Sequence, residues 1–261
     1  ITTPFLAPVW IVGLVWVLRV PRLRFLGIAY VALIGEMLLF HGKHYYPAAV
    51  YSIFIAAGAV PIEEWTRRLP VVRAAALVYA LAFGAVFLPL SVPVLPEPSF
   101  VAYIARVTTT LHLPHDALAT ENGREAQQLP GDWADMHGWP ELAAAVERVY
   151  DGLPARERAQ AVVFAGNYGE ASAIEFFAPG IPVISEHNQF WVWGTKGYTG
   201  NVLVQVNGSC FASQHLYASR TVVTTLRTPW AIGWEQNVPI AICRGIRRPL
   251  ATIWPSIKLF I

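Results

Sequence analysis

The stretch AAALVYALAFGAVFLPLSVPVLPEPS, residues 74–99, decides how this chain is organised. Residues 74–92 carry no charge and approach the roughly 20 apolar residues that a membrane-spanning helix needs. Three prolines follow, at positions 93, 96 and 98, and a helix does not continue through such a run because proline lacks the backbone donor. The stretch therefore predicts a final membrane span and a boundary near Pro96. We expect a membrane region at 1–96 and a second domain at 97–261.

Upstream of this span, the chain has three further apolar stretches, at 5–18, 25–40 and 46–62. They are apolar on all sides, whereas the surface helix of a soluble protein has polar residues on a 3.6-residue period. The first two are short and need their flanking Trp, Arg or Tyr residues to reach both interfaces. The mean hydropathy of +0.43 and the 14% charged residues fit the same interpretation. The sequence predicts four transmembrane helices; four buried helices of a soluble bundle are the alternative.

The basic residues between the stretches predict the orientation of the spans. Arginine is retained in short cytoplasmic loops. The first and third loops contain three arginines each, Arg19, Arg22, Arg24, Arg67, Arg68 and Arg73. We therefore expect the second loop and everything after Pro96 to be extracytoplasmic. The formal net charge of +2 is too small for a protein that neutralises nucleic-acid phosphates, so no nucleic-acid partner is expected.

The residues after Pro96 alternate between helical and strand-like patterns. Two stretches have helical spacing, at 139–150 and 171–177. Short apolar runs predict five strands, at 161–166, 182–185, 202–206, 221–226 and 239–243. Strands that alternate with helices are typical of an α/β domain. We expect an α/β extracytoplasmic domain with a mixed, partly parallel sheet.

The second loop, GKHYYP at 42–47, is a candidate contact for a lipid phosphate. Lys43 supplies a compact positive charge, and Tyr45 and Tyr46 supply phenolic donors that suit phosphate oxygens. The alternative is an interfacial anchor, because Tyr and Lys are common at membrane surfaces. Glu36, one turn below the outer end of its span, and His44 are candidates for polar support of this site; Glu36 could instead extend to the interface.

Two segments of the second domain contain candidate ligand-binding residues. In FAGNYGE, 164–170, Asn167 and Glu170 lie where a strand turns into a helix, and free N–H groups at a helix start suit a polar ligand. The alternative is a structural turn with Glu170 at the positive end of the helix dipole. In SEHNQFWVWG, 185–194, we single out His187, Asn188 and Trp191, which could hold a sugar ring or only cap the sheet. No GxSxG sequence supports a hydrolase.

The two cysteines allow one disulfide, between Cys210 and Cys243, in a compartment where disulfides persist. Neither cysteine belongs to a cluster with the ligand spacing of a zinc site. The sequence therefore predicts no metal ligands and does not determine whether a divalent ion takes part.

Several stretches in this order resemble the C-terminal part of glycosyltransferase family 39, the bacterial relatives of protein O-mannosyltransferases and aminoarabinose transferases. They are GKHYYPAAVYSIFIAAGAVPIEEW at 42–65, ADMHGWPELAAAVERVY at 134–150, FAGNYGEASAIEFF at 164–177, SEHNQFWVWG at 185–194 and NVPIAICRGIRRPLATIWPSIK at 237–258. The resemblance implies a GT-C membrane enzyme that transfers a sugar from a polyprenyl-phosphate donor to an acceptor glycan, lipid or protein. It implies a location in the inner membrane of a bacterium and no permanently bound cofactor.

Only Lys43, Tyr45 and Tyr46 take a role from this resemblance, as donor-phosphate ligands. The family's catalytic acid lies in an N-terminal outer loop that has no counterpart in 1–261, so we expect no catalytic residue in this stretch and no activity from it alone. Ala231–Glu235 stand where relatives carry a cysteine, so the resemblance does not extend to a bridge with Cys243. A non-catalytic, membrane-anchored module that binds a glycan or a partner is the alternative function.

Overall fold

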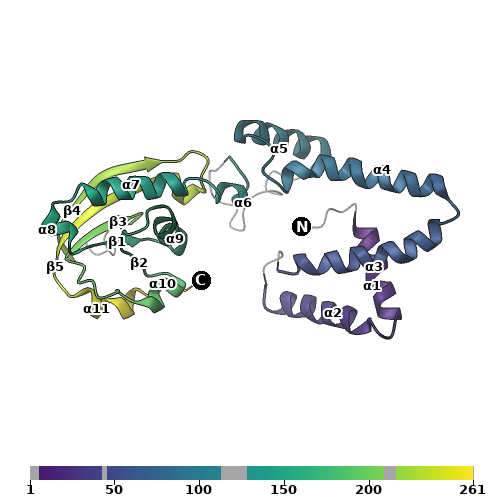
Figure 1. Ribbon diagram of the computed structural model, residues 1–261, viewed down its shortest axis with the longest axis horizontal. Coiled ribbons are helices and arrows are strands. Elements are labelled where there is room, and N and C mark those ends of the chain that lie inside the picture. Colours follow the sequence, from purple (N-terminus) through teal and green to yellow (C-terminus); the bar gives the residue numbers. More distant parts are fainter. Residues whose placement is uncertain (1–5, 43–45, 113–127, 209–215, 261) are drawn as a thin grey trace. The chain divides into compact units, whose positions relative to one another are not determined.

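The computed structural model describes residues 6–42, 46–112, 128–208 and 216–260, and the chain divides into two compact units at Pro96 (Figure 1). The first unit is 1–96 and the second is 97–261. The α-helices are α1 Ala7–Arg19, α2 Arg24–Leu39, α3 Ala48–Thr66, α4 Pro70–Phe87, α5 Glu97–Leu111, α6 Gly131–Ala134, α7 Trp139–Asp151, α8 Ala155–Arg158, α9 Tyr168–Phe177, α10 Asn188–Trp193 and α11 Leu250–Ile253. Short 3-10 helices are η2 Leu88–Leu90, η3 Gly233–Glu235 and η4 Trp254–Ile257.

The first unit is helical, and each predicted apolar stretch forms a helix, but the helices differ in length. Two are long and apolar enough to cross a membrane: α3, with 19 residues, and α4 continued by η2, with 21 residues. In contrast, α1 has 13 residues and α2 has 16. At 1.5 Å per residue, α1 extends only about 20 Å, against a hydrocarbon core of roughly 30 Å. The four predicted spans therefore reduce to two helices of spanning length in the part of the chain that the structure describes.

Helices α1 and α3 approach each other at two glycines. A Cβ atom added to Gly13 would lie 1.8 Å from the carbonyl oxygen of Phe54, and one added to Gly58 would lie 2.0 Å from that of Val9. The backbones can only come this close because both positions lack a side chain. Close crossing at small residues is how helices pack in membranes, where the surrounding lipid is as apolar as the side chains.

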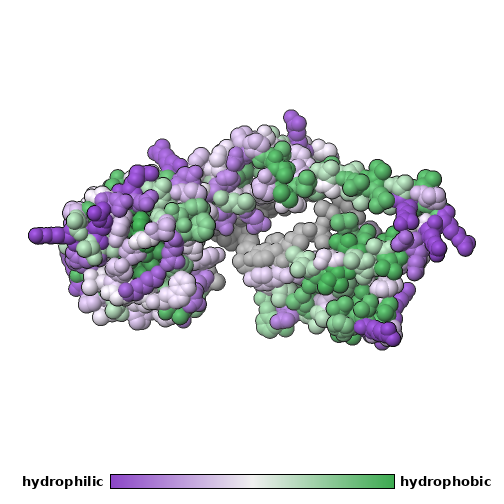
Figure 2. All heavy atoms as spheres, viewed as in Figure 1, coloured by the Kyte–Doolittle hydropathy of each residue, from purple (hydrophilic) through white to green (hydrophobic). Residues whose placement is uncertain are grey.

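Beside this crossing, aromatic rings fill the space between α1, α2 and α3. Phe54 is fully buried and packs edge-on against Tyr30, with 4.9 Å between ring centroids. The hydroxyl groups of Tyr30 and Tyr51 are hydrogen-bonded at 3.3 Å, which satisfies polar atoms that lipid could not. In contrast, α4 has no buried residue, and Figure 2 shows a largely apolar surface along it.

The second unit contains a five-stranded sheet in the order β2-β1-β3-β5-β4. The strands are β1 Ala161–Ala165, β2 Val183–Ser185, β3 Val202–Val206, β4 Tyr217–Arg227 and β5 Asn237–Ile246. Strands β1, β2 and β3 pair in parallel, and β5 pairs antiparallel with both β3 and β4. The mixed, partly parallel sheet predicted from the sequence is confirmed, and each predicted strand is present, with β4 and β5 longer than expected.

Apolar clusters cover both faces of the sheet. On one face, α7 and α9 pack against the strands through residues such as Val146 and Ile174, both fully buried. On the other face, the cluster includes Trp254 and is packed against by Trp191 of α10. Helix α9 connects β1 to β2 over the first face of the sheet, and the segment with α10 connects β2 to β3 over the other face (Figure 1). Because β2 and β3 lie on opposite sides of β1, the direction of winding reverses at the boundary between β1 and β3.

Candidate functional site at the carboxyl edge of the sheet

The turn from β1 into α9 is held by a network that starts at Asn167, the N-cap of α9. Its Oδ1 accepts a hydrogen bond from the backbone N–H of Glu170 at 2.9 Å. The carboxyl of Glu170 turns back, and its Oε2 accepts from the backbone N–H of Gly166 at 2.6 Å. The arrangement differs from a capping box in that Glu170 accepts from the residue before the N-cap, but it likewise gives Glu170 a structural role at the helix start.

Glu170 also faces a second buried carboxyl, that of Glu235 in η3. Asn167 Nδ2 donates to Glu235 Oε1, 68 positions away in sequence, at 2.8 Å, so one asparagine contacts both acids. Glu170 has 0% of its surface exposed and Glu235 4%. Asn207, directly after β3, donates from Nδ2 to the carbonyl of Trp234 at 3.3 Å, which anchors η3 over this edge.

The burial of this acid pair changes how both groups titrate. Burial, followed by the charge of Glu235, raises the pKa of Glu170 to about 8. Burial also raises the pKa of Glu235, to which Asp135 adds a repulsive charge. Burial and the neighbouring Asp132 raise the pKa of Asp135 as well. Glu170 therefore keeps its proton at neutral pH, and the neighbouring charges that act on these three groups are carboxylates.

His187 follows β2 at the same edge of the sheet. Its side chain is 3% exposed, and both ring nitrogens are buried without a hydrogen-bond partner. Burial lowers its pKa, so the ring is neutral at pH 7. The ring of Tyr168, the first residue of α9, packs edge-on against the imidazole with 4.9 Å between centroids. The groups after β1 and after β2 are therefore in contact.

Buried polar atoms without partners gather at this one edge. They are both ring nitrogens of His187 after β2 and Oε1 of Gln205 near the end of β3. Each such atom costs about 1–3 kcal/mol if nothing satisfies it. In open α/β sheets, ligands bind outside the carboxyl ends of the strands where the direction of winding reverses. The acid pair, Asn167 and Asn207 lie at the β1–β3 boundary that meets this description.

The other sequence candidates in this unit have different surroundings. Asn188, next to His187, has a left-handed backbone with φ of 49°, and its N–H donates to the carbonyl of Leu259 at 2.9 Å. Trp191 packs on the opposite face of the sheet and is hydrogen-bonded to Trp254. Asn167, Glu170 and His187 thus come together, whereas Trp191 belongs to the packing of the C-terminal segment.

The candidates in the membrane unit lie largely outside the described residues. Lys43, His44 and Tyr45 are among the residues that the structure does not describe. Tyr46 is 59% exposed, and Glu36 is exposed on α2. The lipid-phosphate site predicted at this loop stays a prediction. Of the cysteines, Cys243 is buried on β5 and disulfide-bonded, while Cys210 lies outside the described residues.

Sequence reasoning missed three residues of this edge: Tyr168, Asn207 and Glu235. Asn207 directly follows a predicted strand, as Asn167 does, and this position was the available signal. Glu235 precedes a strand rather than following one. It reaches the site because β5 is antiparallel to β3, so the start of β5 lies at the carboxyl edge of the parallel strands. Strand direction cannot be read from composition.

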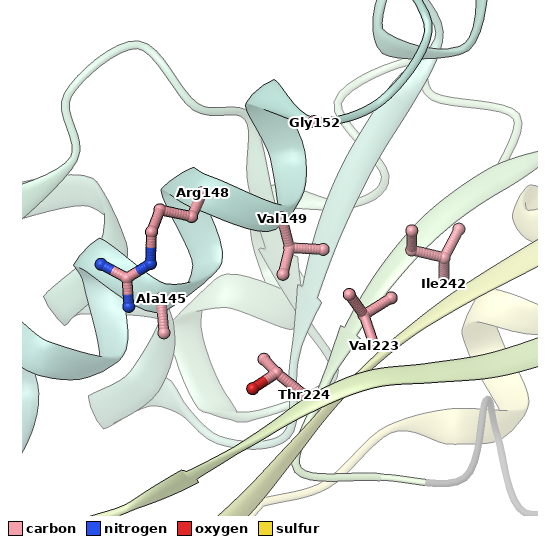
Figure 3. A pocket seen from close by; sticks show the side chains of 7 residues that line it. All are labelled: Ala145, Arg148, Val149, Gly152, Val223, Thr224 and Ile242. Atoms are coloured by element: carbon pink, nitrogen blue, oxygen red, sulfur yellow. The ribbon is translucent and has the colours of Figure 1, made fainter.

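A pocket of about 310 Å³ lies elsewhere, between α7 and strands β4 and β5. Figure 3 shows Ala145, Val149, Val223 and Ile242 along its walls, with Arg148 as its charged residue. Its aliphatic lining offers few groups to orient a polar ligand. In the segments that the structure describes, no group of three or more His, Cys, Asp or Glu is arranged to hold a metal ion.

Comparison of the chain with protein-family models, with curated proteins and with solved structures gives no match.

Proposed function

We propose that this chain is the C-terminal part of an integral-membrane glycosyltransferase, which transfers a sugar from a polyprenyl-phosphate donor to an acceptor at the outer face of the inner membrane. The observation that carries the proposal is the buried polar network at the β1–β3 boundary, in a domain that follows two helices of membrane-spanning length. Two stretches on which the family resemblance rests, 164–177 and 185–194, contribute residues to this one edge.

In this proposal the two units have different tasks. The membrane unit holds the lipid part of the donor, and Lys43, Tyr45 and Tyr46 contact its phosphate. Electrostatic stabilisation of a leaving phosphate is the catalytic contribution that such a cluster can make. The α/β domain binds a sugar or the acceptor outside the membrane. The chemistry is an inverting attack of an acceptor hydroxyl on the sugar C1 carbon, with the lipid phosphate as the leaving group.

The transfer assay uses the complete gene product in membranes, with a radiolabelled polyprenyl-phosphate hexose. We expect label in an acceptor fraction with the complete protein, none with residues 1–261 alone, and reduced donor use in Lys43→Ala. Transfer by residues 1–261 alone would contradict the proposal, as would unchanged donor use in the Lys43 variant. A C-terminal alkaline phosphatase fusion tests sidedness, because this enzyme is active only outside the cytoplasm. An inactive fusion of normal abundance would overturn the outer location.

A second candidate function is a membrane-anchored module that binds a glycan or a partner without catalysis. The burial of Glu170 and Glu235 favours it for the α/β domain, since a general base must reach the proton that it removes. The complete gene product distinguishes the two: sugar binding together with transfer supports the transferase, and sugar binding without any transfer supports the module.

A further inference from the structure

The surface over the acid pair combines amide groups with exposed aromatic rings. The side chains of Asn167 and Asn207 are half-buried, so part of each faces solvent. Tyr168 is 52% exposed and Trp234 is 45% exposed. Asn167 precedes Tyr168 in the chain, and Asn207 is hydrogen-bonded to the backbone of Trp234. Each amide is thus linked to one exposed aromatic residue, Asn167 to Tyr168 through the chain and Asn207 to Trp234 through a backbone hydrogen bond.

The charges around this surface disfavour an anion. Glu235 and Asp135 both act on the network as negative charges, whereas Asn167, Asn207 and the Gly166 N–H act on the acids through hydrogen bonds and carry no charge. A phosphate or carboxylate ligand would be repelled here. A hydroxyl group would not be, because it can donate to a carboxylate and accept from an amide N–H.

The buried polar atoms at this edge need both kinds of partner. Neutral His187 has one nitrogen that donates and one that accepts, and neither has a partner. It lies directly behind Tyr168, one of the two exposed rings. Oε1 of Gln205, near the end of β3, is buried without a partner as well. Hydroxyl groups on a ring that stacks on aromatic side chains supply donors and acceptors together.

We propose that this edge binds one uncharged pyranose, placed against the exposed rings of Tyr168 and Trp234 and hydrogen-bonded to the amides of Asn167 and Asn207. This inference rests on the ligand site assigned above to the α/β domain and specifies its ligand. The site then takes an uncharged sugar ring and not the phosphate of a lipid donor, so donor phosphate and pyranose occupy different parts of the protein.

Saturation-transfer NMR on residues 1–261 in lipid nanodiscs tests the inference, with methyl α- and β-pyranosides of glucose and mannose as probes. We expect saturation of the ring protons of at least one pyranoside, weaker signals from glucuronic acid, and no line broadening of inorganic phosphate in the phosphorus spectrum. The absence of pyranoside binding would overturn the inference, as would phosphate binding that Asn207→Ala weakens.

The location is tested with a matched pair of tryptophans. Trp234→Ala should weaken pyranoside binding by roughly tenfold, the upper range for loss of an aromatic contact. Trp193→Ala is the control, because Trp193 is similarly exposed, at 52%, but lies on α10, where its ring packs against Phe190. Equal loss in both variants would overturn the location. Tyr168→Leu, which keeps an apolar cover over His187, should weaken binding without loss of folding by circular dichroism.

Failure of this inference and failure of the proposed function are separable. Transfer by the complete gene product without pyranoside binding by this domain overturns only the pyranose site. Pyranoside binding that depends on Trp234, in a gene product that transfers no sugar, overturns the transferase and leaves the pyranose site in place.

Discussion

The indole N–H of Trp191 donates to the backbone carbonyl of Trp254 at 2.9 Å, and the indole N–H of Trp254 donates to the carbonyl of Trp191 at the same distance. The reciprocal pair fastens α10 to η4 near the C-terminal end of the chain. Lys258 lies 5.0 Å above the Trp191 ring and covers it further. Trp191 is therefore part of a structural contact between two segments 63 positions apart in sequence.

Trp191→Phe should destabilise the protein without altering ligand binding. The change removes one donor and leaves the carbonyl of Trp254 unpaired, at a cost of about 1–3 kcal/mol. Thermal unfolding in detergent, followed by near-ultraviolet circular dichroism, measures the loss. If the two hydrogen bonds depend on each other, Trp254→Phe should lower the stability by a similar amount. The double variant should then lose less stability than the two single variants added together. Additive losses would show that the two hydrogen bonds act independently.

Gly13→Ala should destabilise the membrane unit by about 1–3 kcal/mol or more, because the new methyl group would overlap the carbonyl of Phe54 and force α1 away from α3. The matched control is Gly35→Ala in α2, where an added Cβ meets no atom within 4 Å. Thermal aggregation in detergent should begin at a lower temperature in the first variant only. Equal behaviour of the two variants would mean that α1 and α3 do not cross closely at this point.

Glu170→Gln should make stability less dependent on pH. The folded-state pKa of Glu170, about 8, is above its ordinary value of 4.5, so the folded protein holds a proton that the unfolded chain releases. The contribution of Glu170 to the free energy of unfolding is therefore complete below pH 4.5 and is lost as the pH rises to about 8. Gln keeps the shape and carries no charge, so the variant should melt above the original protein at pH 8.5.

The control for this experiment is Glu147→Gln on the exposed side of α7, which should leave the pH dependence unchanged. Measurements between about pH 7.5 and 8.5 avoid most of the protonation of His187 in the unfolded chain. A Glu170 variant that loses stability equally at both pH values would show that the carboxyl is ionised in the folded state.

His187→Leu should raise the stability of the ligand-free protein while it weakens pyranoside binding. Leucine fills a similar volume and leaves no unpaired ring nitrogen, which removes a cost of about 1–3 kcal/mol per group. Because burial lowers the pKa of His187 below 6.5, the variant should also lose less stability as the pH falls below that value. Unfolding at pH 7 and pH 5 measures both effects. A less stable variant at pH 7 would mean that the imidazole is satisfied in the protein.

The fold was largely accessible from the sequence because its signals are local. Alternation of apolar runs with glycine predicted β1 and its turn into α9, and Asn167 and Glu170 mark that helix start. The length of α1 was less accessible, since its end at Arg19 depends on where the chain turns toward α2. About half of the candidate site could be predicted from the sequence. Residues that follow a parallel strand can be identified by their position in the sequence. The placement of Glu235 at the site depends on the direction of β5, and the structural role of Trp191 depends on a partner 63 positions away.

The reversed direction of β5 separates the framework of the domain from the edge at which we propose ligand binding. The segment before β5 meets the ends of β1 and β3, yet it belongs to neither of the crossovers that build the parallel strands. Changes in its length or sequence would reshape what the edge recognises while the hydrophobic layers stay intact. A family of such domains could diversify its ligands through this one loop.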